Sequence, residues 1–262
     1  MRSKDETHTG GLRDTFLTTH WSLIEDIQQH QDEDRSLIGL LLERYWKPVY
    51  CYLRRKGYRN EDAKDLTQAF FHEVVLNRHL VERADRTKGR FRSFLLNALN
   101  RFLIDQKRKD GARKHIPEAK LVRLDIAHLP ELPQTMTQRS AEDCFAYAWK
   151  SELLDRTLRE VQTHCEQHGL ERHWCLFRDK VLEPALSDGA SEPMKLISAR
   201  YGIESESVAF NMLLTVKRYF KVTLRKNVRT TVLADEYVDE EWHEILGLLG
   251  ERGRKRLGLY VG

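Results

Sequence analysis

Three of the six prolines of this 262-residue chain fall within residues 116–138, and this clustering limits the possible folds more than any other sequence feature. Pro117, Pro130 and Pro133 each fix their own φ angle, lack a backbone N–H and disfavour helix at the preceding residue. Apolar residues do not recur at helical spacing between them. We therefore predict a flexible linker over residues 116–140, with a separately folded part of the chain on each side.

Turn-forming residues are scarce in the rest of the chain. Its 14 glycines and 6 prolines are fewer than the roughly 12% of residues that they make up in average proteins, which disfavours a turn-rich all-β fold. Apolar residues recur three and four positions apart on both sides of the linker, so we predict an all-α fold with two small helical domains. The expected parts are an N-terminal extension (1–35), a first domain (36–115), the linker (116–140), a second domain (141–230) and a tail of mixed charge (231–262).

Local signals place the helices of the first domain. Gly57 suits the position after a helix C-terminus, and Asn60 suits an N-cap because acidic residues follow it. In the helix that then begins, Asp65, Gln68 and His72 are spaced three and four residues apart. They are therefore expected to share one face of that helix.

The net charge of +4 hides a strong sorting of charge along the chain. Ten basic residues against two acids give the segment Arg86–Lys114 a net charge of +8. A second block of six cations, from Lys217 to Arg229, contains no acid, and six acids follow between Asp235 and Glu244. Clusters of this kind are typical of surfaces that bind nucleic-acid phosphates, although a solvated charged face is the alternative interpretation.

The second domain carries the pattern of a helix-turn-helix. A short apolar-periodic segment ends at Tyr201, Gly202 permits the left-handed turn and Ile203 is expected to plug the space between the two helices. Val208, Met212 and Tyr219 are expected to continue the buried face of the second helix. An ordinary αα-hairpin remains the alternative, and the basic block that follows favours nucleic-acid binding.

The basic helix of the first domain combines cations with other side chains that suit DNA. Asn97 and Asn100 can hydrogen-bond to base edges, and Phe91 and Phe94 can wall a displaced base. Burial of the two phenylalanines in the core is the alternative interpretation.

No catalytic or metal-binding motif stands out. The histidines and cysteines between His164 and Cys175 lack a second paired ligand set, so we expect neither a metal site nor a cofactor. Asp62 and Asp65 could hold Mg²⁺ in a nuclease, but few other acids converge with them. The four cysteines form no C-x-x-C pair and are expected to be reduced and mostly buried.

The longest apolar runs are only a few residues, far short of the roughly 20 that a membrane-spanning helix needs. The charged N-terminus lacks the apolar core of a signal peptide. Together these features predict a cytoplasmic protein without a membrane partner.

The first domain contains four motifs: Tyr45-x-x-Pro48-Val49-Tyr50-x-Tyr52-x-Arg54-Arg55, Asp62-Ala63-x-Asp65-Leu66-x-Gln68-x-Phe70-Phe71, Gly89-Arg90-Phe91-Arg92-Ser93-Phe94-Leu95-Leu96 and Asp105-x-x-Arg108. Together they resemble conserved region two of the extracytoplasmic-function (ECF) group of bacterial RNA polymerase sigma factors. The segment from Leu196 to Leu224 resembles the region four helix-turn-helix of the same family.

The resemblance implies three sets of contacts. Core polymerase would be bound by Asp62, Asp65, Gln68 and His72. The promoter minus-ten element would be melted and read by Lys88, Arg90, Phe91, Arg92, Asn97, Asn100, Arg101, Arg108 and Lys109. The minus-thirty-five element would be read by Ser205, Ser207, Asn211, Lys217, Arg218 and Lys221.

The implied function is a sigma factor, with no enzymatic activity of its own, that directs core RNA polymerase to promoters and helps to open them. Its implied partners are the β′ and β subunits of the polymerase, promoter DNA and an anti-sigma factor. The alternatives are a helix-turn-helix regulator without polymerase binding and, more distantly, a metal-dependent nuclease. Phe94, Arg101 and residues 209–211 depart from the family pattern, so base preference does not carry over. A further hypothesis is that the acids of Glu236–Glu244 shield the basic block Lys217–Arg229.

Overall fold

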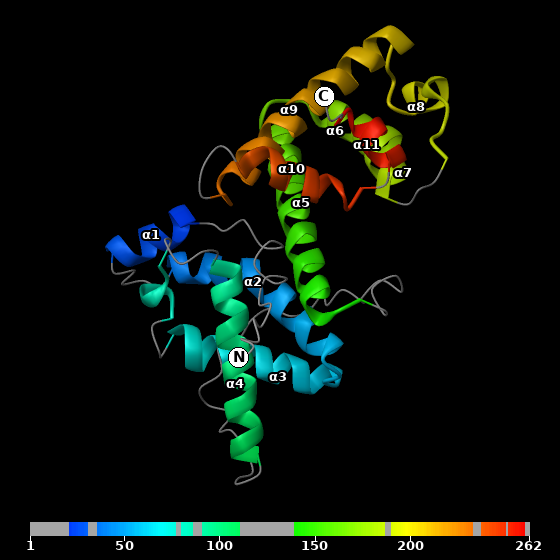
Figure 1. Ribbon diagram of the computed structural model, residues 1–262. Helices are drawn as coiled ribbons and strands as arrows, with labels where there is room; N and C mark the ends of the chain where they lie inside the picture. The colour runs from blue at the N-terminus through cyan, green and yellow to red at the C-terminus, as the bar shows by residue number, and fades with distance from the viewer. Residues whose placement is uncertain are drawn as a thin grey trace, which may run out of the picture. The chain divides into compact units, whose positions relative to one another are not determined.

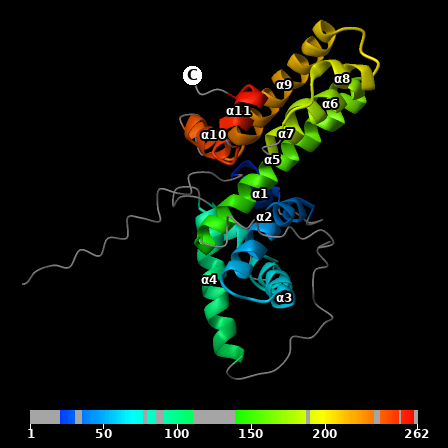
Figure 2. The same ribbon diagram turned by 90° about the vertical axis from the view of Figure 1, so that its right-hand side faces the viewer.

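A computed structural model describes residues 21–30, 36–76, 80–85, 91–110, 139–186, 190–232, 237–249 and 251–259. These residues form helices and connecting turns and no β-strand, which confirms the all-α prediction at the level of fold class. By its internal contacts the chain divides into two compact units (Figures 1 and 2). Unit 1 is Met1–Trp149 with Thr230–Leu233, and unit 2 is Lys150–Arg229 with Ala234–Gly262.

Unit 1 is built from four α-helices, two short helical turns and the beginning of a fifth helix, within the described residues. Its elements are α1 (Trp21–His30), α2 (Ser36–Arg55), α3 (Asn60–Phe70), the π-helical turn η2 (Phe71–Leu76), the 3-10 turn η3 (Val81–Arg83), α4 (Phe91–Asp110) and the first residues of α5 (Ala141–Gln167). Helix α2 continues through Pro48 to Arg55.

Aromatic side chains form the centre of unit 1. Tyr45 on α2 meets Phe91 on α4 edge to face, with ring centroids 5.6 Å apart, and stacks against Phe145 on α5 at 6.5 Å. Phe70 on α3 contacts Phe102 on α4 at 5.7 Å. All five are at most 2% exposed, so large rings from four helices provide much of the burial that holds the unit together.

Part of the expected N-terminal extension belongs to the packed structure. Helix α1 buries Leu23, Ile24 and Ile27 and packs on α2 and η3. The side-chain amide of Gln28 donates hydrogen bonds of 2.9 Å to the carbonyls of both Val81 and Ala84. Residues 1–20 and 31–35 lie outside the described residues.

The turn between α2 and α3 is fixed by backbone hydrogen bonds around Gly57. Its φ angle is +97°, its N–H donates to the carbonyl of Arg54, and the next N–H donates to Leu53. This Schellman arrangement confirms the predicted role of the glycine. The prediction of Asn60 as an N-cap is wrong: it is the first residue of α3, and its side-chain oxygen accepts a hydrogen bond from Tyr50 at 2.6 Å.

Helix α5 starts where the second domain was expected to start, but its first turns pack within unit 1. Ser140 and Asp143 cap the helix reciprocally through hydrogen bonds of 3.0 and 3.2 Å. Cys144, Phe145 and Trp149 are then buried on unit 1 residues, so the contact boundary follows Trp149 and lies inside the helix. Of the expected linker, residues 116–138 lie outside the described residues.

Unit 2 contains the rest of α5 and seven further helical elements within the described residues. They are α6 (Glu171–Phe177), the π-helical turn η7 (Arg178–Leu182), α7 (Glu183–Leu186), α8 (Met194–Arg200), α9 (Glu206–Arg229), α10 (Val238–Leu246) and α11 (Glu251–Leu257). Pro184 lies inside α7 and does not interrupt the helical path that begins with α6 and continues through η7 to Leu186.

Helix α9 lies beside α6 in both views and packs on it (Figures 1 and 2). Its buried face includes Ala209, Met212, Val216 and Phe220, and Phe220 contacts Phe177 with ring centroids 6.0 Å apart. The prediction that Val208 belongs to this face is wrong, because Val208 is 42% exposed. The first buried residue of α9 is Ala209, and Met212 is buried as predicted.

Much of the expected C-terminal tail is helical and packed. Helix α10 buries Trp242 and Ile245 and packs on α9, while α11 packs on α7. At Gly253 the backbones come close: a Cβ atom there would lie 3.0 Å from the carbonyl oxygen of Ala185. The helices α10 and α11 of the expected tail are therefore packed parts of unit 2.

Two smaller expectations can be compared directly with the structure. Cys51, Cys144 and Cys165 are buried and Cys175 is partly buried, all as free thiols, as predicted. Burial raises the pKa of the Cys51 thiol to about 12. None of the described helices has the length and apolar character to span a bilayer.

Candidate nucleic-acid interface

Helices α8 and α9 are joined by the short turn at Gly202 that both the helix-turn-helix and the αα-hairpin interpretations require. Gly202 has a φ angle of +61°, and the N–H of Ile203 closes the turn by donating to the carbonyl of Ser198 at 2.9 Å. The hydroxyl oxygen of Ser205 accepts a hydrogen bond from the N–H of Val208 at 3.2 Å and so caps α9. The turn is therefore fixed on both sides by local hydrogen bonds.

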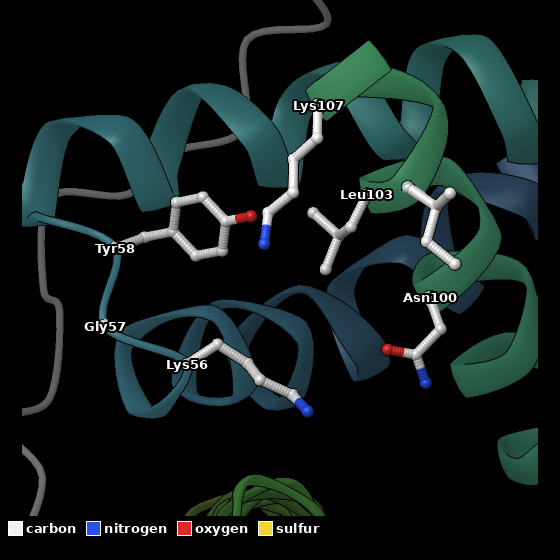
Figure 3. A pocket seen from close by; sticks show the side chains of 7 residues that line it. Lys56, Gly57, Tyr58, Asn100, Leu103 and Lys107 are labelled. Carbon is white, nitrogen blue, oxygen red and sulfur yellow. The ribbon is translucent and has the colours of Figure 1, made fainter.

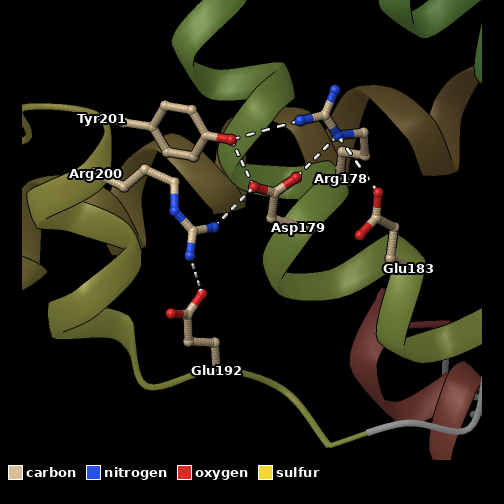
Figure 4. Close-up of polar contacts among 6 residues, drawn as sticks. All are labelled: Arg178, Asp179, Glu183, Glu192, Arg200 and Tyr201. Atoms are coloured by element: carbon tan, nitrogen blue, oxygen red, sulfur yellow. Dashed lines mark hydrogen bonds and ion pairs between the residues drawn. The ribbon is translucent and has the colours of Figure 1, made fainter.

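A network around Asp179 attaches this motif to the rest of unit 2 (Figure 4). The carboxylate of Asp179, on η7, accepts hydrogen bonds from the Tyr201 hydroxyl at 2.5 Å and from Arg178 at 2.8 Å. Arg200, at the end of α8, reaches Asp179 at 3.3 Å and Glu192 at 2.7 Å. Partial burial tends to raise the pKa of Asp179, but the hydrogen bonds from Tyr201 and Arg178 outweigh it and hold the pKa below its ordinary value.

The exposed face of α9 carries most of the residues assigned to the minus-thirty-five element. Ser207, Asn211, Arg218 and Lys221 are exposed, and their spacing places them on one side of the helix. Lys217 is the exception, because it is half-buried and not exposed. Its burial lowers the pKa of the ammonium group. Ser205 is exposed as well, with its hydroxyl oxygen used as the cap.

Two apolar side chains also belong to this face, and the sequence analysis did not place them there as binding residues. Phe210 is 60% exposed and Val222 is 66% exposed. Ala209, by contrast, is buried in the core of unit 2, so its side chain cannot contact a base in this structure. The helical register could have identified Phe210, because the buried positions Ala209, Met212 and Val216 leave it outside the buried side of α9.

One contact bears on the hypothesis that acidic residues shield the basic block. Arg225 on α9 forms a 2.8 Å ion pair with Asp239 on α10. Glu244 instead pairs with Lys150 at 2.9 Å, and Glu241 is buried. The acidic segment therefore has partners in α5 as well as in the basic block.

The residues expected to contact core polymerase lie on α3 and η2. Asp62 and Asp65 are exposed, and Gln68 and His72 are half-buried. The change from α-helix to π-helix after Phe70 falls between Gln68 and His72. Asp62, Asp65 and Gln68 therefore lie on the regular α-helix α3, whereas His72 lies on the π-helical turn η2.

The structure corrects two of the assignments to the minus-ten element. Phe91 is fully buried against Tyr45, and Arg92 is 1% exposed, with its guanidinium 3.9 Å above the ring of Trp149. Neither side chain reaches the surface of unit 1, and Trp149 on α5 covers Arg92. Lys88 and Arg90 lie outside the described residues, as does the side chain of Lys109.

The remaining residues of this set follow one side of α4. Asn97, Arg101 and Arg108 are exposed, and Ile104 between them is 51% exposed. Their spacing of four, three and four residues makes a continuous stripe along the helix. Cations and an amide therefore face solvent beside an apolar side chain.

A pocket of about 420 Å³ lies between this helix and the turn that follows α2 (Figure 3). Asn100, half-buried on α4, is held by the Tyr52 hydroxyl, which lies 2.8 Å from its side-chain oxygen. The pocket is lined by Lys56, Gly57, Tyr58, Asn100, Leu103, Ile104 and Lys107.

Sequence reasoning identified Asn100 as a binding candidate but missed the other lining residues. Lys107 was counted only as part of the basic segment, and Lys56 and Tyr58 were not noticed. They come from a turn more than 40 positions before Asn100, so only the packing of α2 on α4 brings them together.

Within the described ranges, histidine, cysteine, aspartate and glutamate side chains form no group of three or more that could hold a metal ion. His164 instead stacks on Tyr219, with ring centroids 3.9 Å apart. Asp62 and Asp65 thus have no converging ligand among these residues.

Comparison of the chain with protein-family models, with curated proteins and with solved structures found no match in any of the three.

Proposed function

We propose that the chain is an ECF-type sigma factor, which binds core RNA polymerase in the cytoplasm and directs it to promoters. In this proposal unit 1 supplies the region two helices and unit 2 supplies the region four helix-turn-helix. The observation that carries the proposal is the pairing of two cationic, solvent-facing helices, α4 and α9, with a helix-turn-helix in one of the two units.

The surface of α9 supports duplex DNA binding. Arg218 and Lys221 are positioned to neutralise phosphates, and Ser207 and Asn211 offer hydrogen-bonding groups near the start of the helix. Exposed Phe210, beside them, suits apolar contact with thymine methyl groups in a major groove.

The surface of unit 1 supports the other two activities. The stripe of Asn97, Arg101 and Arg108 on α4 suits a separated promoter strand, because it combines charge with a base-reading amide. Exposed Asp62 and Asp65 on α3 offer a separate acidic surface for the polymerase.

Co-purification with core polymerase tests the proposal most directly. Asp65→Ala and Gln68→Ala should weaken retention of the chain on immobilised core enzyme while leaving its helical circular dichroism unchanged. Gln29→Ala is the control, because Gln29 is an exposed amide on a different helix of unit 1. Retention that neither α3 variant reduces would contradict the assignment.

A regulator that binds DNA without polymerase is the second candidate, and the same helix-turn-helix supports it. Run-off transcription on genomic fragments separates the two. A sigma factor should start specific transcripts when added to core enzyme alone, and Arg101→Ala or Arg108→Ala should reduce permanganate reactivity of the opened promoter. A chain that binds duplex fragments but starts no transcript would instead be a regulator.

A further inference from the structure

We infer that a pocket between α9 and α10 binds the oligophosphate group of a small molecule, a kind of ligand that the proposed function does not include. The pocket has a volume of about 430 Å³ and is lined by Val222, Arg225, Lys226, Arg229 and Val238. This volume lies within the roughly 300–1,000 Å³ that small-molecule sites occupy. All five residues belong to unit 2, so the site forms within one folded part of the chain.

Three of these lining residues are cations from the last two turns of α9. Arg225, Lys226 and Arg229 are exposed, and the two arginines lie four residues, about 6 Å, apart along the helix axis. A guanidinium group can donate two parallel hydrogen bonds to one phosphate, whereas an ammonium group acts as a point charge. The pocket therefore offers two forked donors and a third positive charge to a chain of linked phosphates.

The end of a helix favours cations in any case, because the C-terminus of the helix dipole is negative. Lys226 and Arg229 lie in the last turn of α9, and this effect explains part of their placement. It does not explain the recess that they share with Val238, the first residue of α10. The N-terminal end of α10 has the opposite polarity, so it adds to the attraction for an anion.

An anionic group of the chain itself already contacts one of the cations. The carboxylate of Asp239, in the first turn of α10, lies 2.8 Å from a guanidinium nitrogen of Arg225. Its side chain is 70% exposed and that of Arg225 is 53% exposed, so water screens this ion pair and it is weak. An oligophosphate has more charge and more acceptor oxygens than one carboxylate, so it can displace Asp239 from Arg225.

The neutral part of the lining indicates that the phosphates are recognised, and not an organic group attached to them. Val222 and Val238 are small and aliphatic. The described residues of the lining include no aromatic ring and no neutral hydrogen-bonding side chain. A base or a sugar would therefore find neither a stacking surface nor a specific polar partner among them.

The helix that carries the cations is held in place before any ligand binds. Leu224 and Val228, on its opposite side, are fully buried. Between them, the side-chain amide of Asn227 donates a buried hydrogen bond of 3.0 Å to the hydroxyl of Thr157 on α5. A preorganised site of this kind loses little conformational freedom on binding, which favours affinity.

An oligophosphate in the pocket would oppose binding of duplex DNA. Arg218 precedes Arg225 by seven residues, so both lie on the same side of α9. Negative charge in the pocket would therefore repel the phosphates of a duplex on this side. This consequence rests on the proposed function, whereas binding of the oligophosphate itself does not.

Isothermal titration calorimetry of the full-length chain with sodium tripolyphosphate tests the inference. Citrate at the same ionic strength is the control ligand, because it is a multivalent anion without phosphate. Tripolyphosphate should bind roughly tenfold more tightly than citrate. Adenosine triphosphate then distinguishes the source of the group: affinity equal to that of tripolyphosphate supports a nucleotide, and weaker binding supports free oligophosphate.

Lys226→Ala and Lys195→Ala form a matched pair of variants. Both lysines are exposed on helices of unit 2, but Lys195 lies on α8, which precedes the opposite end of α9. Lys226→Ala should weaken tripolyphosphate binding about fivefold, whereas Lys195→Ala should change it less than about twofold because salt screens its distant charge. Asp239→Ala should tighten the binding, because it removes the competing carboxylate from Arg225.

Equal affinity for tripolyphosphate and citrate would overturn the inference, as would equal losses in the two lysine variants. A duplex fragment whose affinity depends on Lys226, with no measurable binding of tripolyphosphate, would assign this surface to the DNA backbone instead. Failure of the proposed function gives a different pattern. If tripolyphosphate binds through Lys226 but the chain starts no transcript with core enzyme, the pocket assignment stands and the sigma function fails.

Discussion

The hydrogen bond between Tyr201 and Asp179 should be a main attachment of the helix-turn-helix to unit 2, and a double-mutant cycle can measure it. Tyr201 directly precedes the turn at Gly202, and its hydroxyl lies 2.5 Å from the carboxylate. Asp179→Ala, Tyr201→Phe and the combined variant form the cycle. Each single change removes this bond, and the combined change removes it only once.

The structure sets the expected size. A hydrogen bond to a charged group contributes about 1.5–3 kcal/mol when its partners are sheltered, and the Asp179 side chain is only 14% exposed. The partner Arg178 is 43% exposed, so its ion pair adds little. We therefore expect Tyr201→Phe to lower the free energy of unfolding by about 2 kcal/mol, with a coupling energy of about 1–2 kcal/mol between the two sites.

The same contact predicts a pH dependence. The hydrogen bonds hold the pKa of Asp179 below its ordinary value, so its stabilisation is complete above the pKa of the unfolded chain and is lost as pH falls through the folded pKa. The difference in urea stability between wild type and Asp179→Ala should be constant near neutral pH and shrink below about pH 4.

Urea unfolding followed by circular dichroism gives both quantities, and duplex binding gives the functional effect. Tyr201→Phe should also weaken binding to a duplex promoter fragment, because the turn loses its anchor. A coupling energy of zero, or a stability difference that is unchanged in acid, would refute the reasoning.

The remaining predictions concern packing and charge. Arg92→Ala should lower the free energy of unfolding by about 1–3 kcal/mol through loss of its stacking on a tryptophan ring, measured in urea, whereas a surface DNA contact would leave stability unchanged. Gly253→Val should cost about 1–3 kcal/mol because α11 meets α7 closely there, while Gly39→Ala, in open space on α2, should stabilise by about 0.5–1 kcal/mol; thermal melts that show the reverse order would contradict this. Asp239→Ala should raise duplex affinity at low salt by freeing Arg225, and unchanged affinity would dispose of the shielding hypothesis for this pair.

Single residues predicted helix ends and turns correctly where the backbone angle of that residue decides the structure. Gly57 and Gly202 both mark turns with positive φ, as expected, because glycine alone adopts that conformation at little cost. Asn60 shows the limit of this approach. Its side chain could cap a helix, but its oxygen accepts a hydrogen bond from the Tyr50 hydroxyl on α2 instead. That contact joins two helices, so it does not follow from the residues next to Asn60.

The candidate binding residues divide in the same way. Asn97 and Arg101 are both exposed, and their spacing of four residues places them on one side of α4. Arg92 reads as one more cation of a basic segment, yet it is buried. Arg92 stacks on Trp149, which lies beyond the proline-containing segment. Helical periodicity predicts only which residues of one helix share a face, so it cannot predict a contact between residues this far apart in the sequence.

By itself, the sequence determined that the described chain is helical, that its charge is sorted, and that two helices joined by a turn at Gly202 lie within residues 194–227. These features depend on spacing and on single residues with restricted backbone angles. The tertiary structure alone decided which cations remain on the surface, that α5 begins within unit 1, and that α2 and α4 together make a pocket. Burial is a sum over neighbours that lie far apart in the chain, so it exists only once the helices have packed.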